Sequence, residues 1–108
     1  MATIPQEITD TIRGYVKHIE QQIPVRKAIV FGSFAKGNFD EQSDIDLAIF
    51  SDHFASMSRV EGTTYLLTQA LRFGWDLEPI AFTGTEYDER LGIVEEIIQT
   101  GIEVADLG

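Results

Sequence analysis

Two aspartates that stand two residues apart on a predicted strand are the clearest chemical feature of this sequence. Asp44 and Asp46 belong to an alternating stretch, residues 43–50, in which apolar residues fill the positions between them. Because successive side chains of a strand point to opposite faces, both carboxylates are expected on one face. At about 5 Å and an effective dielectric of about 20 they repel each other by roughly 3 kcal/mol. A cation would remove that cost, and Mg²⁺, which prefers hard oxygen ligands and often binds carboxylates together with phosphates, is the expected one.

A glycine and a serine at the end of the preceding predicted strand indicate a phosphate site. The apolar run 28–31 predicts a buried strand that stops at Gly32-Ser33. Glycine lets the backbone approach a ligand closely, and Ser33 is expected to cap a short helical turn, 34–36, whose free amides attract an anion. Lys36 adds a positive charge to this turn. The glycine patterns of P-loop and dinucleotide-binding proteins do not occur here.

These residues resemble the signature of the DNA polymerase β-like nucleotidyltransferase superfamily. The signature consists of Gly32-Ser33, ten intervening residues and then Asp44-Ile45-Asp46, between predicted strands. Within the superfamily the chain resembles the minimal nucleotidyltransferase (MNT) domains, which are often paired with HEPN-domain proteins. The resemblance implies the polymerase β-like fold, an α/β (α+β) arrangement with a small mixed β-sheet and helices packed on it.

The resemblance also implies a third carboxylate on the next strand, most often an aspartate. Residues 75–82 predict this strand, with Asp76, Glu78 and Ile80 on one face. Glu78 matches the family position best, and Asp76 is the second choice. Since glutamate is one methylene longer, the strand is expected to sit slightly further from the metal. Pro79 cannot donate to a ladder and predicts an edge or bulged position.

The resemblance therefore implies a site with three carboxylates and a phosphate cradle. The expected catalytic and metal-binding residues are Asp44, Asp46 and Glu78, with one or two Mg²⁺ ions. The residues expected to bind the nucleotide are Gly32, Ser33, Lys36 and Ser43. The implied reaction is the transfer of AMP from ATP to a hydroxyl group, by in-line displacement at the α-phosphate with release of pyrophosphate.

The acceptor is left open by the motif, and three interpretations remain. The chain has little beyond the predicted catalytic core, so the acceptor surface is expected from another chain. The resemblance to HEPN-paired domains implies a tyrosine of a HEPN-type toxin, which adenylylation would silence. One alternative is a small-molecule nucleotidyltransferase with its acceptor pocket at a dimer interface. The other is a non-catalytic antitoxin that binds its partner stoichiometrically, and the glutamate at the third position favours it.

Composition sets the remaining expectations. A chain of 108 residues with 44% hydrophobic residues predicts a single nucleotidyltransferase domain over residues 1–108. The net charge of −10 argues against direct binding to nucleic acid and permits a basic protein partner, in a homo- or hetero-oligomer. No apolar run approaches the ~20 residues of a membrane span. With no signal pattern and no cysteine, a cytoplasmic location is expected.

Three longer helices complete the predicted order α-β-α-β-α-β-α. Residues 3–23, 56–73 and 86–100 show helical apolar spacing, and a short strand is expected at 102–105. The predicted core positions of the second helix are Val60, Leu66, Leu67, Ala70, Leu71 and Phe73. Those of the third are Tyr87, Leu91, Val94, Ile97 and Ile98.

Caps and sheet faces follow from the same patterns. Thr3 and Gln6 are expected to form a capping box at the first helix, and Gly74 to end the second. The face of the sheet that carries the acids is expected to be open. The apolar residues expected on the opposite face are Ile29, Ile45, Leu47 and Ile49.

Overall fold

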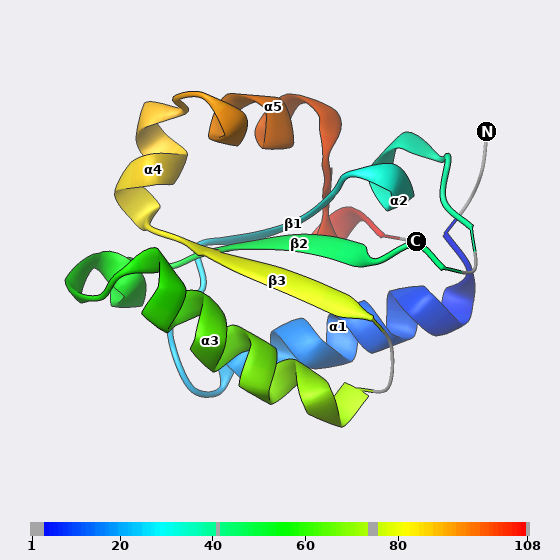
Figure 1. The fold of residues 1–108 in the computed structure, drawn as a ribbon, viewed down its shortest axis with the longest axis horizontal. Helices are drawn as coiled ribbons and strands as arrows, with labels where there is room; N and C mark the ends of the chain where they lie inside the picture. The colour runs from blue at the N-terminus through cyan, green and yellow to red at the C-terminus, as the bar shows by residue number, and fades with distance from the viewer. Residues whose placement is uncertain (1–3, 41, 74–75, 108) are drawn as a thin grey trace.

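A mixed sheet with helices on both of its faces forms the protein (Figure 1). The computed structural model describes residues 4–40, 42–73 and 76–107. Within these residues the sheet has four strands in the order β3-β2-β1-β4. The predicted α/β (α+β) class, with its small mixed sheet and packed helices, is confirmed.

The sheet contains both antiparallel and parallel strand pairs. β1 (Lys27–Phe31) pairs antiparallel with β2 (Ile45–Phe50) and with the short β4 (Ile102–Glu103), whereas β2 pairs parallel with β3 (Leu77–Phe82). The terminal strand predicted at 102–105 is confirmed but shorter. β3 lies at an edge of the sheet, as its proline predicted.

Helices α1 (Gln6–Glu20) and α3 (Arg59–Ala70) cover one face of the sheet (Figure 1). α1 buries apolar residues every three or four positions, and the buried Tyr15 donates a hydrogen bond to the Leu66 carbonyl of α3 at 2.8 Å. α1 is shorter than predicted and has no side-chain cap. Gln6 donates to Asp10 instead of closing a capping box, and Thr3 lies outside the described residues.

α3 presents fewer of its apolar residues to the core than predicted. Leu66 and Ala70 are buried, but Val60, Leu67 and Leu71 are exposed, so the prediction for these three was wrong. The reason lies at Gly62, where an added Cβ would stand 2.8 Å from the Ala81 Cβ and 2.9 Å from the Phe54 ring. The helix approaches the sheet through this glycine, which turns its other apolar positions outward. Gly74, the predicted cap, lies outside the described residues.

The predicted last helix is two helices. α4 (Gly84–Glu89) and α5 (Ile93–Thr100) are separated by Arg90 and Gly92, which have φ of 52° and 59°. This break brings Val94 and Ile97 onto the sheet and leaves Leu91 71% exposed, so its predicted core position was wrong.

The face that carries the acids is therefore covered along part of its length, and the expectation of an open face was wrong. Ile29 lies on this face, packed with Ala48, Phe50 and Ile97. Its predicted place beside Ile45 was wrong, because the antiparallel register sets it opposite Ala48, and opposed residues share a face.

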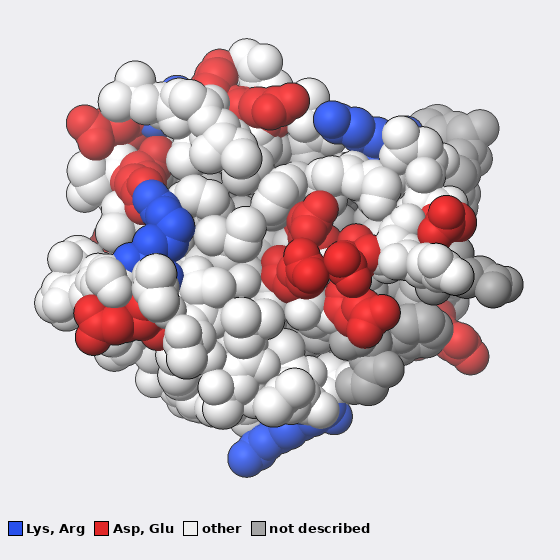
Figure 2. Space-filling view, in the orientation of Figure 1, with Lys and Arg blue, Asp and Glu red and all other residues white. Residues whose placement is uncertain are grey.

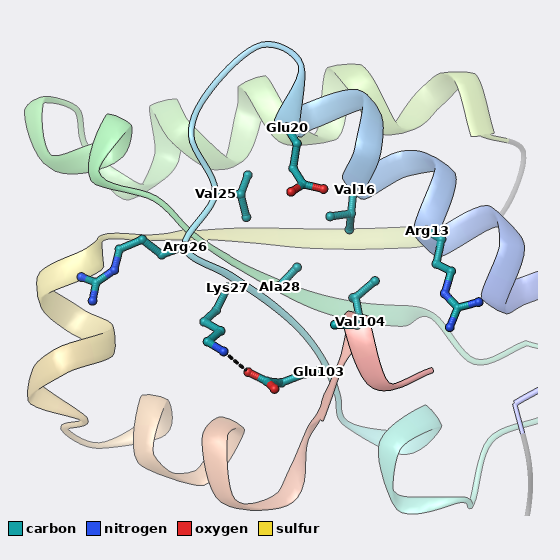
Figure 3. A pocket seen from close by; sticks show the side chains of 10 residues that line it. Arg13, Val16, Glu20, Val25, Arg26, Lys27, Ala28, Glu103 and Val104 are labelled. Atoms are coloured by element: carbon teal, nitrogen blue, oxygen red, sulfur yellow. Dashed lines mark ion pairs between the residues drawn. The ribbon is translucent and has the colours of Figure 1, made fainter. Parts of the chain in front are cut away.

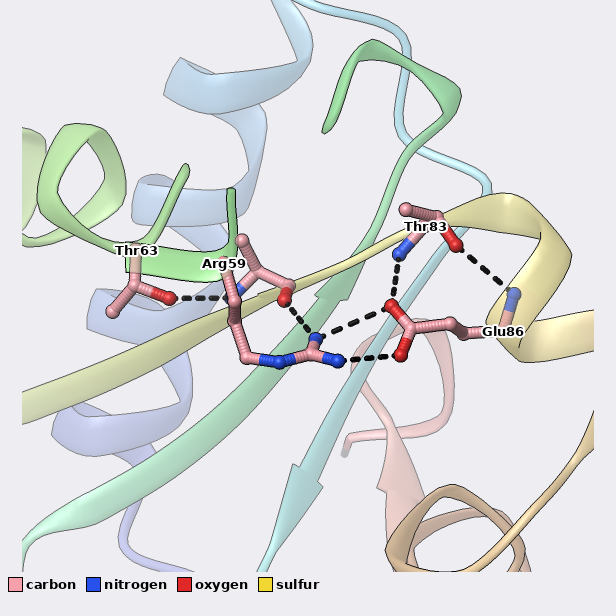
Figure 4. A network of polar contacts seen from close by, with 5 residues as sticks. Arg59, Thr63, Thr83 and Glu86 are labelled. Atoms are coloured by element: carbon pink, nitrogen blue, oxygen red, sulfur yellow. Dashed lines mark hydrogen bonds and ion pairs between the residues drawn. The ribbon is translucent and has the colours of Figure 1, made fainter. Parts of the chain in front are cut away.

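The outer edge of β3 is closed by side chains of α3 (Figure 4). Thr63 Oγ1 accepts from the Ala81 amide at 3.0 Å, and Arg59 donates to the Ala81 carbonyl at 2.7 Å. Pro79, two residues earlier, has no amide hydrogen. Together they reduce the number of unpaired groups on this edge that invite another strand. A search of the described helices finds none with the length and apolar content of a membrane span.

Candidate active site

The turn between β1 and α2 (Ser33–Lys36) depends on a glycine. Gly32 has φ 71° and ψ −148°, a conformation that essentially only glycine adopts. It occupies the N-cap position of α2, and Gly37 ends this single turn in the left-handed region. The prediction that Ser33 caps the turn was wrong, because Gly32 holds the cap position and α2 has no side-chain cap.

The same glycine packs directly against the first candidate carboxylate. An added Cβ at Gly32 would stand 2.3 Å from Asp46 Oδ2. Phe31, the last residue of β1, is opposite Asp46 in the register, which brings the turn over this carboxylate. The cradle and the carboxylate predicted separately from the sequence therefore form one site.

The second and third carboxylates reach the same place from neighbouring positions. Glu78 on β3 stands in register with Asp46 on β2, so the two side chains share a face on adjacent strands about 4.8 Å apart. Asp44 directly precedes β2 and is exposed, whereas Asp46 is half-buried. Figure 2 shows acidic side chains gathered in a compact group on this side of the molecule. Asp44, Asp46 and Glu78 are called the acid cluster below.

The carboxyl groups of the acid cluster perturb one another. Burial raises the pKa of Asp46 first, and the charge of Asp44 raises it further. The pKa of Glu78 is also raised, first by partial burial, then by the charge of Asp44 and a hydrogen bond with it, and then by Asp46. Each shift has the sign expected for a carboxyl group that is partly buried and lies near like charges.

Asp76 lies at the margin of this cluster. It directly precedes β3, its side chain is exposed, and its backbone carbonyl accepts a hydrogen bond from the Ile45 amide at 2.8 Å. Its charge is the last of the causes that raise the Glu78 pKa. The structure therefore places Glu78, and not Asp76, opposite Asp46.

The comparison with known protein families agrees with this geometry. The sequence pattern of the nucleotidyltransferase domain family matches residues 10–104. The chain belongs to the nucleotidyltransferase domain family. The matched range contains the Gly32 turn and the whole acid cluster, and the predicted family is confirmed.

Two relatives extend this result. A candidate protein adenylyltransferase from Methanocaldococcus jannaschii is 25% identical over 101 residues, which cover 91% of this chain and 99% of that protein. The crystal structure of a candidate nucleotidyltransferase from Sulfolobus solfataricus matches with a TM-score of 0.62 and 19% identity, over 95% of this chain and 89% of that one. The second likeness shows that the nucleotidyltransferase fold is shared.

The donor set of this nucleotidyltransferase domain suits a hard divalent cation. All donors of the acid cluster are carboxylate oxygens, and the pKa values of Asp46 and Glu78 are raised first by burial and then by neighbouring negative charge, which a bound cation would offset. Among the residues that the structure describes, however, no three acidic or histidine side chains are already arranged to hold a metal ion. The chemistry of the donors fits, and their orientation is not preset.

The remaining predicted nucleotide-binding residues lie near the turn. Lys36 ends α2 and is exposed. The Ser43 hydroxyl is engaged within its own loop, where it accepts from the Asp40 amide at 2.9 Å and donates to Asp40 Oδ1 at 3.3 Å. The same carboxylate accepts from the Gln42 amide. Sequence reasoning missed Asp40, although an aspartate that starts a polar loop is typical of such a turn.

Two cavities flank the sheet, and the first of them reaches Ser43, Ile45 and Asp76 beside the acid cluster. One of about 390 Å³ lies under α2 beside Phe34 and Phe39, whose rings stack at 4.4 Å, a pairing that sequence reasoning also missed. The other, of about 300 Å³, lies on the far side of β1 and is lined in part by Arg13, Lys27 and Glu103 (Figure 3). In the second, Lys27 pairs with Glu103 at 2.7 Å, so that cationic group is already matched within the protein.

Proposed function

We propose that this nucleotidyltransferase domain transfers AMP from ATP to a hydroxyl group of a partner protein. The observation that carries the proposal is the register that sets Glu78 beside Asp46, with the Gly32 backbone packed against the same carboxylate. These groups bring three carboxylates and a glycine-only turn together at the start of two adjacent strands. The similarity to a candidate protein adenylyltransferase supports a protein as the acceptor.

The roles of the residues follow from their positions. Asp44 and Asp46 would hold Mg²⁺, and Glu78 would complete the ligand set from the next strand. Bound Mg²⁺ would supply the charge stabilisation that phosphoryl-group chemistry needs at the entering and leaving oxygens. The Gly32 turn, which has no side chain in the way, lets the triphosphate approach the backbone, and Lys36 offers it a positive charge.

In the proposed reaction one bond forms and one bond breaks at the α-phosphorus. The acceptor oxygen forms a bond to the α-phosphorus of ATP, and the bond from that phosphorus to the bridging oxygen breaks. Pyrophosphate leaves, and the acceptor proton passes to the exposed Glu78 carboxylate. The half-buried Asp46 is held by the Gly32 turn and serves as an anchor, whereas Glu78 is the more accessible base.

We infer that the acceptor is a tyrosine of a HEPN-domain protein, which AMP transfer would silence. This step rests on the resemblance of the chain to HEPN-paired minimal domains. Its test is incubation of the purified chain with labelled ATP, Mg²⁺ and a purified HEPN-domain protein. Label on a HEPN tyrosine together with pyrophosphate release is the expected result, and mass spectrometry would locate the modified residue.

Stoichiometric binding without transfer is the second candidate function. The observation that favours it is the acid cluster itself, whose carboxylates are not prearranged around a metal within the described residues. In that case the HEPN-domain protein would be silenced equally by the chain and by its Asp44→Asn/Asp46→Asn variant, with no label transferred.

A further inference from the structure

The outer face of α3 carries apolar side chains that the fold does not bury. Val60 and Leu67 are 76% and 42% exposed, and Leu71, which begins the 3-10 turn directly after α3, is 84% exposed. With Thr64 they recur at i, i+4, i+7 and i+11, which is one face of a helix. The opposite face buries Leu66, so α3 is apolar on two sides. That pattern is typical of a helix that is covered on both sides. Val60, Thr64, Leu67 and Leu71 are called the α3 stripe below.

Charge is missing from the same surface. Residues 62–71 contain no charged side chain, although 24% of the whole chain is charged. Solvated helix faces normally carry charged residues, whereas the centres of protein interfaces are depleted of them. Charged residues flank this segment, with Arg59 and Glu61 in the first turn of α3 and Arg72 after it, so the composition typical of an interface is confined to residues 62–71.

A groove runs from the α3 stripe to Asp76, at the margin of the acid cluster. It has a volume of about 460 Å³ and lies between the C-terminal half of α3 and the start of β3, where Leu67, Leu71 and Asp76 contribute to its walls. Asp76 stands two residues before Glu78 and adds to the field at that carboxylate. Because α3 runs back toward the start of β3, its last turn lies at the same end of the sheet as the acids (Figure 1).

The second half of β3 is poorly suited to pairing with a strand of a partner protein. Thr63 and Arg59 hydrogen-bond to the outward amide and carbonyl of Ala81 (Figure 4). Pro79 has no amide hydrogen to offer to a further strand. A partner must contact side chains, and the exposed apolar side chains here are those of the α3 stripe.

We infer that the α3 stripe and its groove dock the acceptor protein, an inference that rests on the proposed function. The occupant is a basic element of that protein, with apolar side chains that enter the groove and Lys or Arg beside them. The net charge of −10 opposes docking of a second copy and attracts a basic partner. Seated here, the partner lies beside Asp76 and Glu78, where the acceptor hydroxyl is needed.

The test compares two matched double variants. Leu67→Asp/Leu71→Asp places two charges in the stripe. Leu91→Asp/Ile93→Asp places the same two charges on exposed apolar residues, 71% and 56% exposed, at the turn between α4 and α5. All four positions face solvent, so both variants should keep the circular dichroism spectrum and the Mg-ATP affinity of the unmodified chain.

Two readouts use the purified HEPN-domain protein as the probe: its affinity by calorimetry, and the KM and kcat for label transfer. A third readout is the mass of the chain alone by light scattering. The stripe variant should weaken affinity and raise the KM about tenfold or more, as loss of central interface anchors does, with kcat unchanged. The control variant should change neither. A neutral Leu67→Ser/Leu71→Ser variant should follow the stripe variant, which separates lost apolar contact from added charge.

The outcomes separate this inference from the proposed function. If the chain binds the HEPN-domain protein without transferring label, the proposed transfer fails, while weakened binding by the stripe variant still supports the docking surface. Equal affinity for both double variants would overturn the docking surface and leave transfer standing. A chain that is dimeric alone and monomeric as the stripe variant would assign the stripe to a second copy. Absence of any binding to the HEPN-domain protein would overturn the assigned occupant.

Discussion

The two ends of the sheet differ in how their charged side chains are arranged. Where β2 and β3 end, opposite charges are paired: Arg59 contacts Glu86 at 2.5 Å, and Arg26 contacts Asp88 at 2.8 Å. Where the same strands begin, three carboxylates stand together, and the described residues hold no ion pair there.

The ion pairs at one end of the sheet stabilise the fold, whereas the acid cluster at the other end destabilises the metal-free protein. The paired end ties α3 and α4 to the strand ends, and Arg59 also lies over the Phe82 ring at 4.7 Å. The acid end lowers the stability of the metal-free protein through like-charge repulsion. A cluster of perturbed acids beside a glycine-only turn is typical of a functional site. Variants at the two ends should accordingly divide into effects on stability and effects on transfer.

Asp46→Asn should have the largest effect on transfer, a loss of about a thousandfold or more, because it removes a ligand that acts on the transition state. The melting temperature of the metal-free protein should stay the same or rise, since repulsion falls. Labelled AMP transfer and thermal melts check both expectations. The matched change at the paired end, Glu86→Gln, should lower the melting temperature and leave transfer within about twofold. Similar losses of transfer from both variants would erase the contrast between the ends.

Glu78→Gln and Asp76→Asn test which of these two residues supplies the third carboxylate of the acid end. Glu78→Gln should reduce kcat by about a hundredfold, since it removes the third ligand and the proton acceptor. Asp76→Asn should reduce it only a few-fold, because Asp76 lies at the margin of the cluster. Single-turnover rates with saturating ATP measure the two. The reverse order would move the third carboxylate to Asp76.

Gly32→Ala tests the contact that joins the turn to the cluster. It adds backbone strain of about 1–3 kcal/mol and forces the Asp46 carboxylate to move. Both the free energy of unfolding and the Mg-ATP affinity should therefore fall. Gly92→Ala is the control, because it has a similar positive φ but nothing within 4 Å of the added Cβ. It should lower stability and leave Mg-ATP affinity unchanged. Normal Mg-ATP binding by Gly32→Ala would make Gly32 a turn residue only.

The smallest expected effect is on the pH dependence of stability. The pKa values of Glu86 and Asp88 are lowered, chiefly by hydrogen bonds from Arg59 and Arg26, so their contribution is lost as pH falls through those lowered values. The raised pKa values of Asp46 and Glu78 act in the opposite sense: their contribution is present at low pH and is lost as pH rises through the raised values.

In EDTA the protein should therefore gain some stability as pH falls from 7 through the raised pKa values of Asp46 and Glu78, and lose stability as pH falls further through the lowered pKa values of Glu86 and Asp88. Asp46→Asn/Glu78→Gln should abolish the gain in thermal melts recorded over this pH range. A gain that persists in this variant would assign it to other groups.

The sequence predicted the acid end better than the elements around it. The strand period of two placed Asp46 and Glu78 on faces that the structure brings together, because one residue of slip would have moved either to the other face. Which strand faces which could not be derived from spacing, so Ile29 was assigned to the wrong face. The extent of residues 1–108 as one domain, the acceptor and the partner stay predictions.

Other misses have tertiary causes. The outward turn of Leu67 and Leu71 follows from the close approach of Gly62 to β3, which helical periodicity does not contain. The break between α4 and α5 requires Arg90 to adopt the left-handed backbone conformation, which its sequence alone does not favour. The Ser43 hydroxyl hydrogen-bonds within its own loop because Asp40, three residues earlier, offers a local partner.

The most direct test of the acid cluster as the Mg-ATP site is calorimetric titration of ATP with and without Mg²⁺. The chain should bind ATP much more tightly with Mg²⁺, and Asp44→Asn/Asp46→Asn should lose that enhancement while keeping its fold by circular dichroism. The same enhancement in the double variant would contradict the assignment of the acid cluster as the nucleotide and metal site.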